Sequence, residues 1–317
     1  MTGLLTFLGV AFGLLVIITA VLTGREMLRP ARRSAGWAIA RGLPCDPADA
    51  GYEYEQWWVD RPKGIRLPVW EITTAGAAEG RHATGAHGSS QAPTIVLVHG
   101  WGQGRIDMLG RMLPAWIDRA ERFILYDQRG HGESEAPGSN LGDREVDDLL
   151  ALLEHLGDGP IVLVAYSMGA VVSLAALSED AEAHRHVAGV FAYAPYADFH
   201  ESLCARLRQM RLPRRPVTDL ALLFHRVRGI RPRSFHGDEL ARIDVPVTIL
   251  HGVEDEISPI EHGRFIASHI PGATLHEVRD VGHTLEALLQ CDQHDPAAEA
   301  FMNRLADRPA QPAASST

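Results

Sequence analysis

One serine, Ser167, has neighbours that favour nucleophilic chemistry. It follows an apolar run at residues 162–166, and a second apolar run begins after Gly169. This pattern predicts a buried strand that turns sharply into a helix. Such a turn needs small residues two positions before and after the serine, and Ala165 and Gly169 meet that need. A serine held there presents its hydroxyl for attack on an acyl carbonyl.

A serine hydroxyl needs a base that takes its proton and a carboxylate that orients the base. His283 is the candidate base, because it follows Gly282 directly and lies between a predicted strand at residues 273–278 and a short helix. Asp255 is the candidate carboxylate, because it follows the apolar strand at residues 245–252. A carboxylate just past the carboxyl end of a parallel strand lies at the sheet edge that also carries the nucleophile.

Other residues compete for these two roles. Asp198 follows a predicted strand at residues 187–193 and could reach the base from that earlier strand end. Glu254 and Glu256 flank Asp255 and are interpreted as ordinary solvated charges. The chain has 16 histidines, most of them in polar or loop stretches, so position alone singles out His283.

The negative charge that develops on an attacked carbonyl oxygen calls for two backbone N–H donors. The residue after the nucleophile, Met168, is expected to supply one of them. The second is expected from the loop after a predicted strand at residues 94–98, where closely spaced glycines let the backbone approach a substrate. Trp101 is the expected donor and Gly102 is the alternative, although a plain tight turn explains this loop equally well.

With these pieces in order, residues 50–305 resemble the α/β-hydrolase fold superfamily, in its lipase-, esterase- and peptidase-like branch. The segment at residues 122–134 is similar to the Asp-x-Arg-Gly-x-Gly-x-Ser turn of that branch. The resemblance implies structural roles for Asp127, Arg129 and His131. It also implies that branches with an aspartate nucleophile do not fit, because Ser167 holds the nucleophile position.

The remaining chain predicts an α/β fold, with a mostly parallel central sheet and helices on both faces. Two early strands precede a loop at residues 75–93 that is expected to be mobile. Strands are predicted at residues 52–59, 65–73, 95–98, 123–126, 161–165, 187–193 and 247–250, and helices at 105–119, 144–156 and 169–177.

An insertion at about residues 198–243 interrupts this alternation. In the superfamily the same place holds a small helical cap that covers the pocket and gates entry. The insertion is rich in arginine. These arginines are interpreted either as a solvated helical face or as contacts to anionic lipid headgroups or an acidic substrate.

Residues 1–24 carry no charged side chain, and their apolar run is long enough to span a bilayer as a helix. We expect an uncleaved transmembrane anchor there. A cleaved signal peptide, and hence export, is the alternative, but it would need a basic start and a shorter apolar core. Because Arg25, Arg29, Arg32 and Arg33 follow the span, the catalytic domain is expected to face the cytoplasm.

The expected domains are therefore an anchor at 1–24, a basic juxtamembrane segment and linker at 25–50, a hydrolase domain at 51–307 and a disordered tail at 308–317. A net charge of −10 gives no reason to expect nucleic acid as a partner. Three scattered cysteines, Cys45, Cys204 and Cys291, predict neither a disulfide framework nor a metal site. No cofactor or metal is expected.

The sequence thus predicts a membrane-anchored serine hydrolase that cleaves an acyl ester through Ser167, His283 and Asp255. A small-molecule or lipid-derived ester is the expected substrate, and the lipid-derived one suits the anchor. The alternatives are an acyltransferase or a peptidase on the same fold, and a binding protein that has kept the fold without catalysis.

Overall fold

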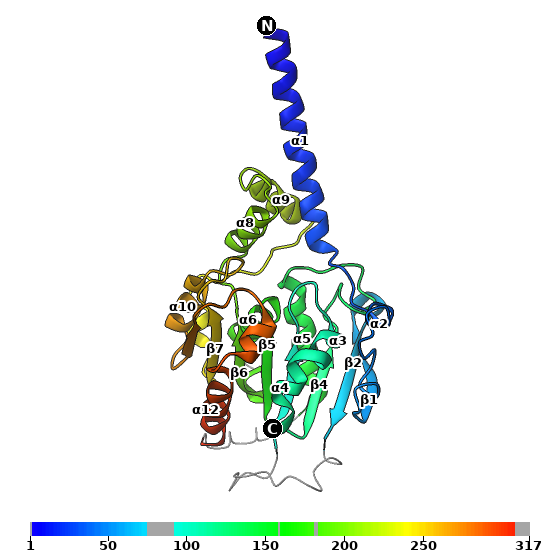
Figure 1. The fold of residues 1–317 in the computed structure, drawn as a ribbon, viewed down its shortest axis with the longest axis vertical. Coiled ribbons are helices and arrows are strands. Elements are labelled where there is room, and N and C mark those ends of the chain that lie inside the picture. Colours follow the sequence, from blue (N-terminus) through cyan, green and yellow to red (C-terminus); the bar gives the residue numbers. More distant parts are fainter. Residues whose placement is uncertain (1, 75–91, 158, 181–182, 308–317) are drawn as a thin grey trace, which may run out of the picture.

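The computed structural model describes residues 2–74, 92–157, 159–180 and 183–307 (Figure 1). The loop expected at residues 75–93 and the tail expected at 308–317 fall almost wholly outside these residues. Over the described ranges the chain forms an eight-stranded sheet in the order β1-β2-β4-β3-β5-β6-β7-β8. The strands are β1 (Tyr54–Arg61), β2 (Ile65–Thr73), β3 (Thr94–Val98), β4 (Arg122–Tyr126), β5 (Ile161–Tyr166), β6 (Val187–Tyr193), β7 (Val247–Gly252) and β8 (Thr274–Val278).

The sheet is mostly parallel, as the sequence predicts. β1 and β2 form an antiparallel hairpin and β2 pairs antiparallel with β4, whereas the pairs from β4 through β8 are parallel. Successive side chains of a strand point to opposite faces. In β3, Val96 and Val98 therefore join one buried core and Ile95 and Leu97 the other. The mostly parallel α/β sheet that the strand pattern predicts and the α/β-hydrolase fold that the resemblance implies are confirmed.

Helices cover both faces of the sheet. One core includes α5 (Asp143–Leu156), α6 (Met168–Glu179) and α10 (Ile260–His269), and the other includes α11 (Leu285–Gln290) and α12 (His294–Ala306). The helix expected at residues 105–119 is divided into α3 (Arg105–Asp107), a π-helical turn (Met108–Met112), α4 (Leu113–Trp116) and a 3₁₀ turn (Ile117–Arg119). Short helices α2 (Ala35–Ile39) and α7 (Ala183–His186) complete the framework.

Two further helices, α8 (Phe199–Gln209) and α9 (Val217–Val227), occupy the insertion between β6 and β7. Helix α9 lies beside the lower part of the long N-terminal helix α1 (Thr2–Leu28), which projects away from the sheet, and α8 packs against α9 (Figure 1). The buried residues of α1 include Val16, Ala20, Gly24 and Met27, whose spacing puts them on one helix face, and Leu28 at the helix end. This face packs against α9.

Most of α1 is apolar and exposed. Leu4, Phe7 and Leu15 each expose more than 60% of their surface, at 63%, 68% and 61%. Among the described residues, α1 is the one helix that is long and apolar enough to cross a membrane. A helix of this kind near an N-terminus can be a membrane span or a signal sequence.

Candidate active site

Ser167 lies at a strained turn between β5 and α6. Its backbone has φ 50° and ψ −117°, a conformation that L-residues adopt only where the surrounding structure enforces it. The small neighbours make the turn possible, because a Cβ atom on Gly169 would lie 2.5 Å from the carbonyl oxygens of Val98 and His99. Helix α6 thus begins in direct contact with the end of β3, as the sharp turn in the sequence predicts.

The structure brings Ser167, His283 and Asp255 together at the carboxyl edge of the sheet. Ser167 Oγ lies 2.9 Å from His283 Nε2, and His283 Nδ1 lies 2.7 Å from Asp255 Oδ2. Ser167 follows β5, His283 follows β8 and Asp255 follows β7. Ser167 and Asp255 are buried, and the His283 side chain is 12% exposed.

The competing carboxylates lie elsewhere. Asp198 accepts a hydrogen bond from the His200 N–H at 2.7 Å and so caps the start of α8. The exposed Glu254 accepts from the Val281 N–H at 3.0 Å. Glu256 is exposed as well, and its Oε2 accepts from Nε2 of the α8 residue Gln209 at 3.4 Å.

Asp255 is held as a carboxylate. Burial would raise its pKa, but hydrogen bonds from His251 and His283 and from the Ser258 N–H lower the pKa well below its usual range. The Ser258 bond is 2.7 Å long. An ionised Asp255 accepts the Nδ1–H of His283, which leaves the Nε2 lone pair facing the hydroxyl of Ser167. This arrangement can carry a proton away from the serine.

Three backbone N–H groups are candidates for the oxyanion hole. Met168 opens α6, and the first N–H groups of a helix have no partner inside it. Trp101 and Gly102 lie in the loop after β3, and within the described ranges neither backbone N–H has a hydrogen-bond acceptor. Both therefore keep a free donor, and the geometry does not separate Trp101 from Gly102.

A buried histidine fixes this loop. His99 Nε2 accepts from the Gln128 N–H at 3.0 Å, so its Nδ1 carries the proton and donates to the Gly100 carbonyl at 2.8 Å. Burial lowers the pKa of His99 to about 4, which keeps the ring neutral. His99 is a positioning residue that the sequence analysis did not single out, although it precedes the glycines directly.

The motif at residues 122–134 forms contacts within the framework. Asp127 accepts from the backbone N–H groups of Arg105 and Glu133, at 2.8 and 2.9 Å. Arg129 binds Asp148 of α5, with Nε–Oδ2 at 2.6 Å. These contacts tie the loop after β4 to neighbouring helices, in keeping with the structural role that the resemblance implies.

A narrow cavity opens over Ser167. Its walls come from Trp101 and Met168 of the framework, from α8 through Leu203 and Arg206, and from Met27 at the end of α1. Sequence reasoning did not foresee Met27 here, because the segment at residues 25–50 that contains it is expected to be a juxtamembrane segment and linker. The contact is tertiary: the Trp101 indole N–H donates to the Met27 carbonyl at 2.9 Å.

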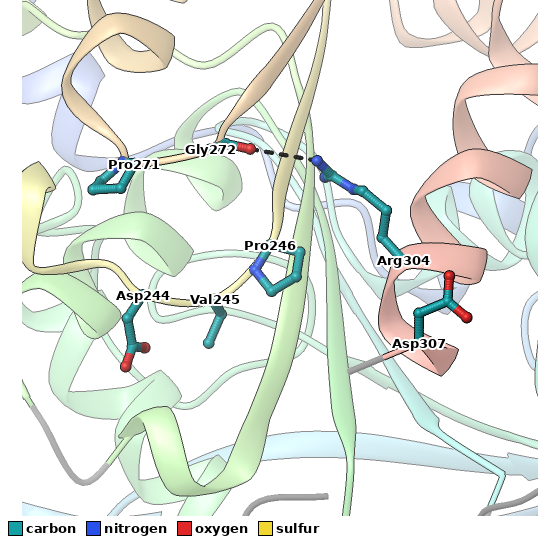
Figure 2. Close-up of a pocket in the computed structure, with 7 residues that line it drawn as sticks. All are labelled: Asp244, Val245, Pro246, Pro271, Gly272, Arg304 and Asp307. Atoms are coloured by element: carbon teal, nitrogen blue, oxygen red, sulfur yellow. Dashed lines mark hydrogen bonds between the residues drawn. The ribbon is translucent and has the colours of Figure 1, made fainter. Parts of the chain in front are cut away.

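A second cavity, of about 430 Å³, lies at the opposite edge of the sheet, before the starts of β7 and β8 (Figure 2). Figure 2 shows the Arg304 side chain directed toward the Gly272 carbonyl. Arg304 also donates to Thr274 and Thr248, both at 2.9 Å, so its guanidinium already has acceptors. The residues around this cavity include no paired nucleophile and base, and Ser167 lies at the other edge.

One group of side chains in the described part of the chain has the spacing of metal ligands. Cys45, Asp46 and Asp49 bring ligand atoms within 4.8 Å of one another. The Cys45 thiol donates to the Asp49 carboxylate at 2.9 Å, which satisfies this pair without an ion. The group follows α2 in the segment before β1, away from the chemistry at Ser167.

The chain belongs to the alpha/beta hydrolase family, whose model matches residues 95–314. The uncharacterized protein YqkD of Bacillus subtilis is 31% identical over 176 residues, which make up 53% of this chain and 56% of that protein. The chain thus spans little more than half of that relative. Human serine hydrolase BPHL is 26% identical over 63% of this chain and 76% of its own length.

Solved structures agree on the fold. The Pyrococcus furiosus esterase Pf2001 matches 87% of this chain and 99% of its own, with a TM-score of 0.65 and 18% identity. A thermophilic esterase from Thermogutta terrifontis matches 80% of this chain and 99% of its own, with a TM-score of 0.55 and 23% identity. At these identities the likeness establishes the architecture alone, and the chemistry must be argued from the site.

Proposed function

We propose that this protein is a serine hydrolase that cleaves an acyl ester, with Ser167 as nucleophile, His283 as base and Asp255 as the group that orients the base. The observation that carries this proposal is the unbroken hydrogen-bonded chain from Ser167 Oγ through His283 to the Asp255 carboxylate. A serine on a strained turn, beside free backbone donors, is the setting in which such a chain activates a hydroxyl.

The reaction proceeds through an acyl-enzyme. His283 Nε2 takes the hydroxyl proton while Ser167 Oγ bonds to the ester carbonyl carbon, and the Met168 and Trp101 N–H groups stabilise the oxyanion. The C–O bond to the alcohol breaks, and His283 gives the proton to the leaving alcohol. Water then loses a proton to His283 and attacks the acyl carbon. The bond from the acyl carbon to Ser167 Oγ breaks, His283 returns the proton to Oγ, and the acid is released.

Names of the relatives favour an ester as substrate. Besides the human serine hydrolase, the rhodomycin D methylesterase DauP of a Streptomyces strain is 37% identical over 71 residues, which make up 22% of each chain. Transfer of the acyl group to an alcohol remains the alternative reaction of the same acyl-enzyme. A competing alcohol in the assay distinguishes the two, since transfer yields a new ester in place of the acid.

We propose further that residues 1–24 anchor the protein in a membrane and that the anchor is retained. The end of α1 is bonded to the rest of the chain: the Leu28 carbonyl accepts from the Ser139 N–H at 2.9 Å, and the Gly24 carbonyl accepts from His225 Nε2 at 2.9 Å. These donors satisfy carbonyls at a helix end that would otherwise need water. With Arg25 and Arg29 exposed after the span, the positive-inside rule places the hydrolase domain, residues 51–307 with its cap at 198–243, in the cytoplasm.

The test combines a fluorophosphonate probe with p-nitrophenyl esters of graded chain length. The wild-type protein should be labelled and should hydrolyse at least one ester, and Ser167→Ala should do neither. Ser268→Ala, which changes an exposed serine on α10, serves as the matched control and should behave as wild type. Labelling of the Ser167→Ala variant, or a wild-type protein inert to both reagents, would contradict the proposal.

A further inference from the structure

We propose that the cavity over Ser167 selects esters that carry an anionic group, a carboxylate or a phosphate, and that Arg206 binds this group. The inference rests on the proposed serine hydrolase function and adds the substrate class. It begins from an arginine beside the nucleophile that has no counter-charge among the residues that the structure describes.

Arg206 lies on α8 and lines the same cavity as Ser167. Its guanidinium carbon lies 4.9 Å from the centre of the Trp101 ring, so the cation stacks on the residue that carries a candidate oxyanion donor. Among the residues that the structure describes, the Arg206 side chain has neither an ion pair nor a hydrogen bond. Half-buried cations without a counter-charge are uncommon in folded proteins.

The two buried arginines of the framework, Arg105 and Arg129, are paired. Arg129 binds Asp148, and Arg105, which is almost fully buried, binds Asp127 and Glu133. Within the described ranges, the arginine at the cavity thus differs from these framework arginines in lacking a carboxylate. A bound anion would supply the missing partner.

A second group points to the same ligand. Ser202 precedes Arg206 by one helical turn on α8, so the two side chains lie on one face of the helix. Ser202 is only 9% exposed and lines the cavity, yet its hydroxyl has no partner among the described residues. Tyr196, on the loop after β6, lines the cavity too, and its buried hydroxyl lacks a partner among the described residues. Buried hydroxyls without a hydrogen bond are costly, and an anionic oxygen would satisfy them.

The electrostatic setting agrees with this geometry. Burial lowers the pKa of Arg206, because the guanidinium loses hydration without gaining an opposite charge. The side chain of Tyr166, the residue before the nucleophile, acts on the Arg206 pKa in the opposite direction. Arginine stays protonated in proteins, so the charge remains available to a ligand.

The other cavity walls are apolar, with Met27, Phe199 and Leu203 among them. An apolar wall beside one cation fits an amphiphilic ester, whose chain lies against these side chains and whose anion meets Arg206. The anion can belong to the acyl part, as in a dicarboxylic monoester, or to the alcohol part, as in a phosphorylated glycerol ester.

Two substrate pairs that differ by the anion test the proposal and its two sources. The acyl pair is p-nitrophenyl hemiglutarate and p-nitrophenyl pentanoate, and the alcohol pair is monoacylglycerol phosphate and monoacylglycerol. In at least one pair, wild type should favour the anionic member in kcat/KM by about tenfold or more, the size expected for a charge-assisted hydrogen bond. Arg206→Gln should remove the preference, measured as the ratio of kcat/KM for the anionic member to kcat/KM for the neutral member of the same pair.

The matched control is Arg208→Gln, an exposed arginine on the same helix, which should keep the wild-type preference. Fluorophosphonate labelling of each variant reports a folded active site. If Arg206→Gln is not labelled, Arg206→Met, which keeps an apolar stem over Trp101, carries the test instead.

A labelled Arg206 variant that keeps the wild-type preference would overturn the proposal, as would a wild-type protein that favours the neutral member in both pairs. In either case, labelling at Ser167 would leave the serine hydrolase function standing. A wild-type protein that neither reacts with the probe nor hydrolyses any ester would overturn both.

Discussion

The two sides of the cavity over Ser167 differ in how their polar groups are satisfied. On the sheet side, the chain from Ser167 through His283 to Asp255 is hydrogen-bonded within the protein, and the Asp255 carboxylate also takes backbone N–H groups. On the other side, the wall from α8 and α1 presents Arg206 and Ser202, without partners in the described part of the chain. We interpret this difference as a division between the groups proposed to perform the reaction and those proposed to select the substrate.

The comparison predicts its largest effect for a change on the sheet side. His283→Ala removes the base and should lower kcat for every ester by about five to six orders of magnitude, as loss of a triad base does in serine hydrolases. Single-turnover kinetics with a neutral p-nitrophenyl ester measure this, with Arg208→Gln as control. A variant that loses only the anionic substrates would place His283 in substrate selection instead.

Asp255→Asn should have the next largest effect. An asparagine cannot fix the His283 tautomer, so kcat should fall by about 10⁴ while KM changes little. Asp198→Asn, at the rival carboxylate that caps α8, should leave kcat near wild type. If Asp198→Asn were the more damaging change, Asp255 would not be the orienting carboxylate.

The Asp255→Asn variant also gives a test of the Asp255 carboxylate through the pH dependence of stability. The folded-state pKa of Asp255 is lowered, so its ionised form stabilises the fold above the unfolded-state pKa of about 4, and that stabilisation is lost as pH falls through the folded value. The free energy of unfolding of wild type should exceed that of Asp255→Asn at pH 7, and the gap should narrow below about pH 4. Denaturant melts across this range measure the gap, and a gap independent of pH would contradict the assignment.

A smaller effect is expected where α6 meets β3. Gly169→Ala places a Cβ atom 2.5 Å from two backbone carbonyl oxygens and should destabilise the fold by about 1–3 kcal/mol. Gly110→Ala, at an exposed position where the new Cβ meets nothing within 4 Å, is the matched control. Thermal melts compare the two, and equal melting temperatures would show that the turn at Ser167 tolerates a looser contact.

The smallest effect on turnover is expected from the exposed part of α1. Deleting residues 2–23 should release the protein from membranes and leave hydrolysis of a soluble ester unchanged, because Met27 and its bond to Trp101 remain. Deleting residues 2–28 removes that part of the wall and should raise KM. Membrane fractionation and steady-state kinetics measure the two outcomes. A fall in kcat with the shorter deletion would show that residues 2–23 contribute to turnover and do more than anchor the protein.

The sequence predicts the sheet side better than the wall for a physical reason. Ser167, Asp255 and His283 each follow an apolar strand, and the carboxyl ends of parallel strands share one edge, so local patterns already bring them together. Met27 and Arg206 line the same cavity because segments far apart in the chain pack against each other. No periodicity encodes such a contact, and an apolar helix near a chain start indicates a membrane before it indicates a cavity wall.

The irregular segments show the same limit. The pattern at residues 105–119 predicts one helix, but the chain interrupts it with a π-helical turn at Met108–Met112. The sequence offers one interpretation for all the arginines of residues 198–243. Only the structure distinguishes Arg206 at the cavity from the exposed Arg208. A solvated arginine is distinguished from one that can bind a ligand by its burial and by its hydrogen-bond and ion-pair partners. No sequence pattern gives either of these.

The most direct measurement of the central claim is the site of covalent modification. Wild-type protein treated with a fluorophosphonate should gain one adduct, and peptide mapping by mass spectrometry should locate it on Ser167, with the rate of labelling reduced strongly in His283→Ala. An adduct on any other residue, or labelling at Ser167 that proceeds equally fast without His283, would contradict the account.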